Sequence, residues 1–488
     1  MMGKVYLVGA GPGDPGLITV KGRRLLENAD CIVYDRLANP RLLSLARERC
    51  RLIYVGKAAS RHTMKQEEIN ALLVHCAAEY ETVVRLKGGD VYVFGRGGEE
   101  GLFLMEHGVE FEVVPGISSC TGGLAYAGIP ITHRGLSHGF RVVTAHDKDD
   151  KLTKLDFASM AHGEETLVFL MGLSKVGEIA AGLLEAGMPM QMPAAVISHA
   201  TLPSQQIVSA PLGELAETLQ CRPLSSPALI VVGKVVSLRE NLNFFEKLPL
   251  FGRKILIPHP GRESSPLTEY FEGLGAKVTE VCTGEIRGIP GAFSAEMLDG
   301  IKCLAFSSKH GVDAFFHGLF ALGKDVRSLA GICIAAVGSA TADRLFSYGV
   351  HADLIPSEFH SDALCEIIRR KTGFAGEEVL FVKVRGSLSP CFVDFGVHVA
   401  ELYENHPMEE ESIRAQARGE SYTDMVFSCS SAVHATAKAL GAEVLRKSRC
   451  FSIGEKTSET LRTYGIMPIQ AQRADLQTLA QTVMTGGK

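Results

Sequence analysis

Short apolar runs alternate with segments of helical spacing along the whole chain. In the first half the runs are VYLVG, CIVYD, TVVRL, FEVVP, RVVTA, TLVFLM, PAAVIS and ALIVVG, which are rich in Val, Ile and Leu. Near-continuous runs of this kind are typical of strands that are buried on both faces of a parallel sheet. Residues 19–29 and 66–79, between such runs, place apolar side chains at helical spacing. The pattern predicts an α/β protein with a mainly parallel sheet.

The apolar pattern is interrupted near the middle of the chain. The segment LRENLNFFEKLPLFGRK follows the run ALIVVGKVV and precedes a new run, KILIP, and it mixes charged residues with Pro249 and Gly252. Such a composition is typical of a short helix followed by a linker. We therefore predict a first domain over residues 1–238, a linker over 239–251 and a second domain over 252–488.

The second half contains a weak internal repeat. The stretch LAFSSKHGVDAFF, followed by IAAVGSATADRLFSYGV, resembles the later stretch MVFSCSSAVHATA, followed by FSIGEKTSETLRTYGI. In each copy an apolar run ends in serines at the start of a helix, and a Gly-x-x-Thr turn then opens a second helix that ends at Tyr-Gly. The repeat predicts two similar α/β lobes that face one ligand site.

Composition narrows the functional classes. The 488 residues carry a formal net charge of −5, so the chain lacks the global basic field of nucleic-acid-binding proteins. No segment approaches the roughly 18 apolar residues that are needed to span a membrane. The twelve cysteines form no CxxC pair, which argues against a zinc ribbon and fits a reducing compartment. We expect a cytoplasmic protein with no metal site and with neither nucleic acid nor membrane as a partner.

A first glycine cluster, GAGPGDPG, follows the run VYLV directly. Glycines at such a turn permit positive φ and let a ligand approach the backbone closely. A dinucleotide-binding turn is one interpretation, because Asp30 and Asp35 lie about 20 residues further on, where such folds place a ribose-binding acid. The spacing is GxGxG and not GxGxxG, however, and Pro12 and Pro15 favour a rigid loop. This turn alone leaves both interpretations open.

A second cluster, RLKGGDVYVFGRGGEE, places Gly88, Gly89 and Asp90 after another apolar run. The turn offers backbone amides and one carboxylate, which suit a ligand with an amino acid or ribose moiety better than a bare phosphate. The sequence contains no GxxxxGK[ST], so a P-loop is not expected. The alternative is that these glycines only form tight turns.

Seven ordered motifs in residues 3–236 carry a family resemblance. They are GAGPGDPGLIT, ADCIVYDRL, YVGK, RLKGGDVYVFGRGGEE, VPGISS, GIPITHRG and FLMGL. Together they resemble the uroporphyrinogen-III C-methyltransferases of the tetrapyrrole methylase family. The resemblance implies two α/β subdomains around a cleft that binds S-adenosylmethionine, and a homodimer formed through this half.

The resemblance also implies roles for single residues. Asp35 matches a proton acceptor and Lys57 a proton donor, although Asp35 could instead cap a helix or pair with Arg36, and Lys57 could simply bind a carboxylate. Arg96, His133 and Arg134 are further candidates for binding the carboxylates of a porphyrinogen. Val91 and Ala200 depart from the residues that relatives often have there. The positions that match cofactor-binding residues are Pro12, Gly88, Gly89, Asp90, Val93, Ser118, Ser119, Met171 and Ala200.

Hydroxyl groups at helix starts recur in the second half. Helix N-termini attract anions, so a site surrounded by them suits a ligand with many carboxylates. Ordinary N-capping is the alternative for each residue taken singly. The candidate substrate-binding residues are Ser307, Ser308, Thr341, Ser428, Ser430 and Thr457.

Residues 252–488 resemble uroporphyrinogen-III synthase through an ordered set of weak motifs. These include ILIPHPGRESSPLTEYFEGLGAKV, FSSKHGV, AVGSATADRL, VRGS, LYEN, FSCSSAV and IGEKTSETL, with His259-Pro260 where relatives often begin with Arg-Pro. The resemblance implies two lobes joined by a two-stranded link, over residues 252–283 with 406–488 and over 284–405. It implies ring closure of hydroxymethylbilane with loss of water and without a cofactor, assisted by Tyr403.

The two resemblances predict a fused enzyme of tetrapyrrole synthesis. The second half would make uroporphyrinogen III, and the first half would methylate it twice to precorrin-2, on the way to sirohaem or cobalamin. Three alternatives stay open. The first half could methylate a later corrin intermediate or be a nicotinamide-dependent oxidoreductase, and the second half could be a non-catalytic anion-binding module.

Overall fold

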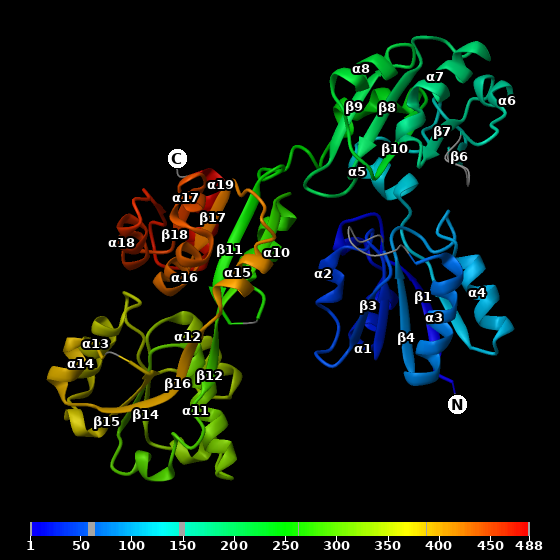
Figure 1. Cartoon of the computed structure of the whole chain (residues 1–488). Coiled ribbons are helices and arrows are strands. Elements are labelled where there is room, and N and C mark those ends of the chain that lie inside the picture. The colour runs from blue at the N-terminus through cyan, green and yellow to red at the C-terminus, as the bar shows by residue number, and fades with distance from the viewer. Residues whose placement is uncertain (1, 57–63, 146–151, 262, 387, 487–488) are drawn as a thin grey trace. The chain divides into compact units, whose positions relative to one another are not determined.

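The computed structural model describes residues 2–56, 64–145, 152–261, 263–386 and 388–486. The chain divides into two compact units, residues 1–252 and 253–488. Each unit combines parallel strands with covering helices (Figure 1), so the predicted α/β class is confirmed.

The first sheet of the first unit has five parallel strands in the order β3-β2-β4-β1-β5. The neighbours Val83 and Val84 on β4 pack on opposite faces, Val83 toward α3 and α4 and Val84 toward α1 and α2. Burial on both faces explains why these strands read as continuous apolar runs. The elements are β1 (Lys4–Gly9), α1 (Val20–Asn28), β2 (Cys31–Tyr34), α2 (Pro40–Leu43), β3 (Arg51–Tyr54), α3 (Gln66–Glu79), β4 (Thr82–Lys87), α4 (Gly97–Glu106) and β5 (Phe111–Val114).

The second sheet departs from the predicted parallel arrangement. Its order is β6-β7-β10-β8-β9, and only β6 and β7 are parallel neighbours. The connection from β8 to β9 is too short for the crossover that parallel neighbours require, so these two strands form a hairpin. The elements are η2 (Ser119–Gly123), α5 (Leu124–Tyr126), β6 (Phe140–Thr144), α6 (Phe157–Ala161), β7 (Thr166–Leu170), η3 (Leu173–Lys175), α7 (Val176–Glu185), β8 (Pro193–Ser198), β9 (Gln206–Pro211), α8 (Leu215–Cys221) and β10 (Ala228–Val232).

Residues 239–251, which the sequence suggests as a linker, pack on the first unit. The segment follows η4 (Lys234–Leu238), begins with α9 (Arg239–Leu242) and buries two apolar side chains. Phe245 is 6% exposed and Leu250 is 0% exposed. The segment is therefore part of the first unit's folded structure.

The strands described in the second unit form one sheet in the order β14-β13-β15-β16-β12-β11-β17-β18-β19. The neighbours are parallel except for β12 and β16, which run antiparallel from the Gly284–Pro407 pair to the Gly288–Tyr403 pair. Separate cores lie on the two sides of this link, one around Phe306 and one around Phe427. The link lies where the sequence suggests the lobe boundaries.

The elements of the second unit follow in chain order. They are β11 (Lys254–Pro260), α10 (Pro266–Gly273), β12 (Lys277–Gly288), β13 (Cys303–Phe306), α11 (Lys309–Ala321), β14 (Cys333–Ala336), α12 (Ser339–Ser347), α13 (Ser361–Thr372), β15 (Val379–Val384), α14 (Pro390–Phe395), β16 (His398–Pro407), α15 (Glu410–Gln416), β17 (Asp424–Phe427), α16 (Ser430–Leu440), α17 (Ala442–Arg446), β18 (Arg449–Ser452), α18 (Glu455–Thr463), β19 (Ile469–Gln470) and α19 (Leu476–Thr485).

Candidate active sites

Three glycine turns meet at the carboxyl edge of the first sheet. A Cβ atom on Gly9 would lie 2.6 Å from the Cα of Gly116 and 2.7 Å from the carbonyl oxygen of Gly89. The Gly89 amide donates to the carbonyl of Gly11 at 2.7 Å, and Gly89 itself has a φ of +71°. A Cβ atom on Gly89 would meet nothing within 4 Å, so this turn borders open space. The edge therefore offers closely approachable backbone, as a ligand site at the end of parallel strands needs.

The Asp90 carboxylate organises the second glycine turn. One oxygen accepts hydrogen bonds from the amides of Tyr92 at 2.8 Å and Val93 at 3.0 Å, and the other accepts from the Gly116 amide at 2.9 Å. Asp90 thus ties the turn after β4 to the turn after β5. Its proposed contact with a cofactor stays a prediction, while its contacts within the protein fix the shape of the turn.

Other predicted cofactor positions come together beside this edge. A Cβ atom on Gly122 would lie 3.1 Å from the Cγ of Pro12, and one on Gly123 would lie 3.0 Å from the Cβ of Ala200. Gly122 and Gly123 belong to η2, which begins at Ser119, and Ser118 is its N-cap residue. Segments that are far apart in the sequence therefore meet around η2.

Left-handed backbone is concentrated in the loops at these edges. Met171, His199 and Thr201 have φ values of 56°, 49° and 68°. β7 and β8 both pair antiparallel with β10, so Met171 and His199 leave the second sheet at the same edge. Phe94 and Arg96, in the loop after Asp90, also have positive φ, of 53° and 60°. Non-glycine residues in this region are uncommon, and they cluster at functional sites.

A buried ionic cluster lies next to Asp35, directly after β2. The Asp35 carboxylate accepts from the Leu37 amide at 3.0 Å and from the Arg85 guanidinium at 3.2 Å. One carboxylate oxygen of Glu100, which is 0% exposed, accepts from Arg85 at 3.2 Å and from the Lys87 ammonium at 2.7 Å. Burial, and then the charge of Arg85, lower the pKa of Lys87. The positive charges of Arg85 and Lys87 therefore formally balance the negative charges of Asp35 and Glu100.

The sequence prediction missed Arg85, Lys87 and Glu100. For Arg85 and Lys87 the signal was present, because charged residues in an otherwise apolar buried strand require partners. The structure pairs Asp35 with Arg85 and gives Asn39 as the N-cap of α2. The role of Asp35 as proton acceptor stays a prediction, and Lys57 lies outside the described residues. Arg96, another candidate, pairs with Glu99 at 2.6 Å on the exposed surface. His133 and Arg134 are exposed in the loop before β6.

In the second unit, Tyr403 faces the start of α11. Its hydroxyl and that of Ser308 share a hydrogen bond of 2.6 Å, and Ser308 is also the N-cap that accepts from the Gly311 amide. The neighbouring Ser307 donates to the carbonyl of Val382 at 3.1 Å. Tyr403 is only 6% exposed, so its hydroxyl is fixed within this group.

The remaining predicted hydroxyls of the second unit do not act as side-chain N-caps. α12, α16 and α18 have Gly338, Cys429 and Gly454 as N-cap residues, and none of the three makes a side-chain capping hydrogen bond. Thr341 and Thr457 are both 4% exposed in the first turns of α12 and α18. Ser430 donates to the carbonyl of Lys456 at 3.1 Å, and Ser428 directly follows β17 and is half-buried. The side-chain capping alternative therefore holds for Ser308 alone among the predicted set.

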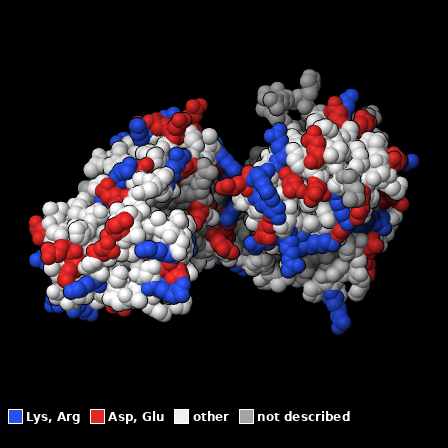
Figure 2. All heavy atoms as spheres, turned by 90° about the horizontal axis from the view of Figure 1, so that it is seen from below, with Lys and Arg blue, Asp and Glu red and all other residues white. Residues whose placement is uncertain are grey.

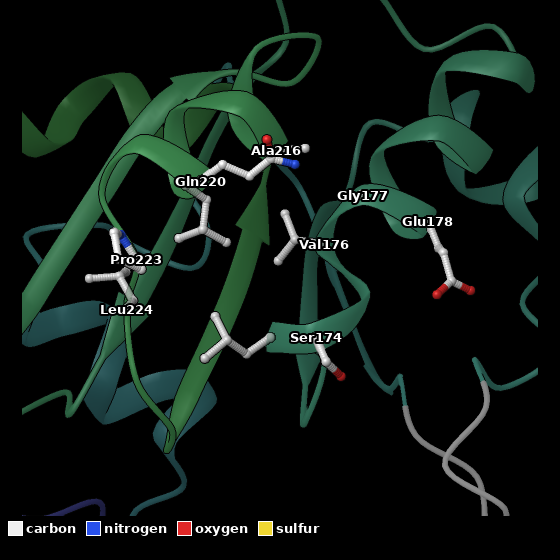
Figure 3. A pocket seen from close by; sticks show the side chains of 10 residues that line it. Ser174, Val176, Gly177, Glu178, Ala216, Gln220, Pro223 and Leu224 are labelled. Atoms are coloured by element: carbon white, nitrogen blue, oxygen red, sulfur yellow. The ribbon is translucent and has the colours of Figure 1, made fainter.

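A pocket of about 410 Å³ lies away from both groups of residues. It is lined by Ser174 of η3, by Val176 at the start of α7, by the end of α8, and by Pro223 and Leu224, which follow α8 (Figure 3). None of the predicted site residues lines it.

Neither the charges on the face seen in Figure 2 nor the described metal-ligand side chains point to a further site. Lys and Arg are interspersed with Asp and Glu on the face that Figure 2 shows. Among the described residues, no group of three or more His, Cys, Asp or Glu side chains could hold a metal ion. No helix in the described part of the chain is long and apolar enough to cross a membrane.

Comparison with known proteins finds a matching family for each half of the chain. Residues 4–216 match the model of the Tetrapyrrole (Corrin/Porphyrin) Methylases, and residues 265–481 match that of uroporphyrinogen-III synthase HemD. A porphyrin biosynthesis protein HemD from Ruminiclostridium josui is 35% identical over 499 aligned residues, which cover 99% of this chain and 98% of that protein. A uroporphyrinogen-III C-methyltransferase from Bacillus subtilis is 42% identical, over 70% of this chain and 71% of that protein.

A solved structure is also similar to the first half. It is the uroporphyrin-III C-methyltransferase of Thermus thermophilus in complex with S-adenosyl homocysteine, which is 46% identical over 48% of this chain and 100% of that one, with a TM-score of 0.43. The matches to both family models, and the similarity to a porphyrin biosynthesis protein over 99% of the chain, exclude the nicotinamide-dependent class for the first half. The chain belongs to the family of porphyrin biosynthesis proteins in which a tetrapyrrole methylase domain is followed by a HemD-type uroporphyrinogen-III synthase domain.

Proposed function

We propose that the second unit closes hydroxymethylbilane to uroporphyrinogen III, and that the first unit methylates this product twice to precorrin-2. The observation that carries the methyl transfer is the position of Asp35 beside the glycine turn. β2 and β4 are adjacent strands, and a Cβ atom on Gly88 would lie 2.5 Å from the Cβ of Leu37. A candidate base and a candidate cofactor turn are thus neighbours at one edge of the sheet.

S-adenosylmethionine supplies the methyl group in this proposal. The approachable backbone around Gly89 fits its amino acid or ribose moiety, and the turns with Pro12, Gly88, Ser118, Ser119, Met171 and Ala200 complete the proposed site. Asp35 takes the proton that the substrate must lose, since Arg85 fixes its carboxylate at the strand end. Lys57 is proposed as the proton donor from the family resemblance alone.

Ring closure needs a different kind of site. Hydroxymethylbilane loses water and one ring is inverted, so the protein mainly has to hold the chain of pyrroles in one geometry. The uncapped first turns of α12, α16 and α18 offer amides to the substrate's carboxylates. The fixed hydroxyl of Tyr403 assists departure of the leaving hydroxyl. We propose no cofactor for this half.

The order of the two reactions follows from their chemistry, because the product of the second unit is the substrate of the first. Sirohaem and cobalamin are the end products that precorrin-2 can lead to. A cytoplasmic location is proposed from the composition, and a homodimer formed through the first unit is proposed from the sequence resemblance.

Supplying the full-length protein with hydroxymethylbilane and S-adenosylmethionine tests the proposal. We expect precorrin-2, identified by mass and absorption spectra, with the type III isomer accumulating when S-adenosylmethionine is left out. Failure to methylate uroporphyrinogen III, with methylation of a later corrin intermediate instead, would favour the alternative for the first half. Binding of the bilane without turnover would reduce the second half to an anion-binding module.

A further inference from the structure

The segment that follows the methylase sheet, residues 239–251, is attached to one wall of the proposed cofactor site. We call it the junction segment, because the second unit begins at Arg253. Its Phe245 ring packs against Tyr126 with centroids 4.7 Å apart and against Phe251 at 5.3 Å. Gly128, close to Tyr126, lies so near the segment that a Cβ atom there would be 2.6 Å from the amide nitrogen of Asn243.

Hydrogen bonds lead from the junction segment to the loop that contains Ala200. The carboxylate of Glu246 accepts from the side-chain amide of Gln205 at 3.1 Å. Gln205 is 4% exposed, and its side-chain oxygen Oε1 accepts a hydrogen bond from the Thr201 amide at 3.0 Å. Each polar atom of the Gln205 side chain is thus used, because its NH₂ group also donates to the Tyr126 carbonyl at 3.2 Å.

The same path continues into the first glycine turn. The hydroxyl of Thr201 accepts from the Asp14 amide at 2.9 Å, and the Tyr126 hydroxyl donates to the Asp14 carboxylate at 2.6 Å. A Cβ atom on Gly13 would lie 2.9 Å from the Thr201 hydroxyl. Thr201 therefore joins the hairpin loop of the second sheet to the glycine turn of the first.

Thr201 is an unfavourable residue for this place. Its φ of 68° is in the left-handed region, which a β-branched side chain rarely adopts. Such a conformation persists only where surrounding contacts over-determine it. The contacts that hold it are the bonds to Gln205 and Asp14, and Gln205 is in turn held by Glu246.

We propose that the junction segment shapes the cofactor site of the methylase, with Glu246 and Gln205 as positioning residues that hold the loop 199–205 in its binding conformation. This inference rests on the proposed function, since that function assigns S-adenosylmethionine to the loop. The junction segment then contributes to cofactor binding by the first half and does more than connect the two halves.

The carboxylate of Glu246 is itself well fixed for this task. Its second oxygen accepts from the side-chain amide of Asn243 at 2.9 Å and from the Arg239 guanidinium. Asn243 also accepts from the Glu246 amide at 3.2 Å, which closes a small ring of bonds within the segment. Its neighbour Lys247 is exposed and donates to the carbonyl of Glu240 within the same segment, so it offers a matched control.

The test compares Glu246→Ala with Lys247→Ala in the full-length protein. Calorimetric titration with S-adenosylmethionine should give a dissociation constant about tenfold higher for Glu246→Ala, the effect of one lost hydrogen bond to a charged group. Lys247→Ala should bind as the wild type does. Without ligand, amide hydrogen exchange in peptides covering 199–205 should be about tenfold faster in Glu246→Ala only.

A double-variant cycle separates this path from general damage. If Glu246 acts through Gln205, the double variant Glu246→Ala/Gln205→Leu should bind no more weakly than the weaker single variant. Additive losses, or wild-type affinity and exchange in Glu246→Ala, would overturn the proposal. If Glu246→Ala does not fold, Asn243→Ala removes one donor to the same carboxylate, and unchanged exchange there would equally overturn it.

The two proposals fail in different ways. A wild-type protein that does not bind S-adenosylmethionine would remove the proposed function of the first half. The exchange experiment needs no ligand, so it still decides whether the junction segment holds the loop. Tight binding by the wild type, with no effect of Glu246→Ala on either measurement, would remove only the role proposed for the junction segment.

Discussion

The fully buried carboxylates of the two units, Glu100 and Asp424, have their charged partners at opposite ends of the two sheets. In the first unit, Arg85 and Lys87 lie near the carboxyl end of β4 and lead directly into the glycine turn. In the second unit, the fully buried Asp424 begins β17, at the amino end, while the hydroxyls of the proposed site follow the carboxyl end. Asp424 accepts from the guanidinium of Arg253 at 2.7 Å and from that of Arg449 at 2.8 Å.

This difference fits the two proposed reactions. Methyl transfer with proton removal needs an ionised base in a fixed position, which buried partner charges provide. The proposed ring closure proceeds through the substrate's own electrons, so the second site can rely on neutral donors, and the buried Asp424 can serve stability alone. The comparison predicts that charge changes harm chemistry in the first unit and folding in the second.

Asp424→Asn should give the largest effect, a loss of about 3–5 kcal/mol in the free energy of unfolding of the second unit, because Arg253 and Arg449 would lose their buried anion. Calorimetric melting of the full-length protein should show one transition moved down and the other unchanged. A uniform shift of both transitions would contradict the idea of two independent units.

The stability that Asp424 contributes should depend on pH. Burial raises its pKa, but hydrogen bonds from Arg253 and Thr423 and the charge of Arg449 outweigh this, so the folded pKa is lowered. A lowered pKa contributes stability that is present above the pKa of an unfolded aspartate and is lost as the pH falls through the folded value. The difference in melting temperature between wild type and Asp424→Asn should therefore shrink in acid.

Asp35→Asn should slow methyl transfer by about 100-fold or more, the scale of a lost general base. The variant keeps the shape of the side chain, so its affinity for S-adenosylmethionine should stay near that of the wild type. Single-turnover methylation and calorimetric titration measure the two quantities, and synthase activity in the same chain is the control. Turnover that survives while cofactor binding collapses would assign Asp35 to binding.

Asp90→Ala should weaken binding of S-adenosylmethionine by about 10- to 100-fold, which corresponds to losing about 1.5–3 kcal/mol of charge-assisted hydrogen bonding. The structure adds a reason, because the carboxylate accepts from three backbone amides that shape the turn. Asp90→Asn keeps one acceptor oxygen and should lose less. Equal affinity of wild type and Asp90→Ala in a calorimetric titration would remove Asp90 from the cofactor site.

Much of the α/β fold followed from the sequence, because strands buried on both faces have an unmistakable apolar pattern. This pattern predicted the five-stranded parallel sheet of the first unit. The repeated motifs of the second half predicted its two similar lobes. The mixed second sheet was not foreseen, since β8 and β10 read alike as apolar runs whichever way they pair. Direction is decided by the short connection to β9 and by the crossover that returns β10 between β7 and β8.

The parts of the candidate site that depend on neighbouring residues in the sequence could be predicted. The parts that depend on contacts between residues far apart in the sequence were missed. The glycine turns have a composition that requires close backbone approach, so Gly89 could be singled out from its neighbours alone. Glu100 could not be assigned, because its partners Arg85 and Lys87 lie on a different element and its sequence neighbours suggest an exposed helix start. Glu246 was read as part of a linker, since charged and proline-containing segments give no sign of a distant partner such as Gln205.

Tyr403→Phe should slow ring closure without abolishing it, the smallest effect of the series. Loss of hydroxide from the bilane is driven by the pyrrole, so a phenol only assists the leaving group. One donor to developing charge contributes up to about 2.7–4 kcal/mol in favourable sites, and we expect less here because the Tyr403 hydroxyl shares a bond of 2.6 Å with Ser308. The variant frees Ser308 to keep capping α11 through its bond from the Gly311 amide, so folding should survive.

Isomer-resolving chromatography decides the role of Tyr403, because the unassisted reaction gives the uninverted ring and the reaction proposed for this enzyme gives the type III product. We expect Tyr403→Phe to make type III product at a reduced rate. Ser308→Ala is the matched variant, since it removes the hydrogen-bonded partner and leaves the phenol in place. A full wild-type rate in Tyr403→Phe would reduce the residue to packing between β16 and α11, and complete loss of the type III product would make it the central catalyst. If Ser308→Ala matches Tyr403→Phe in rate, the pair acts together, because the phenol then depends on its neighbour for orientation.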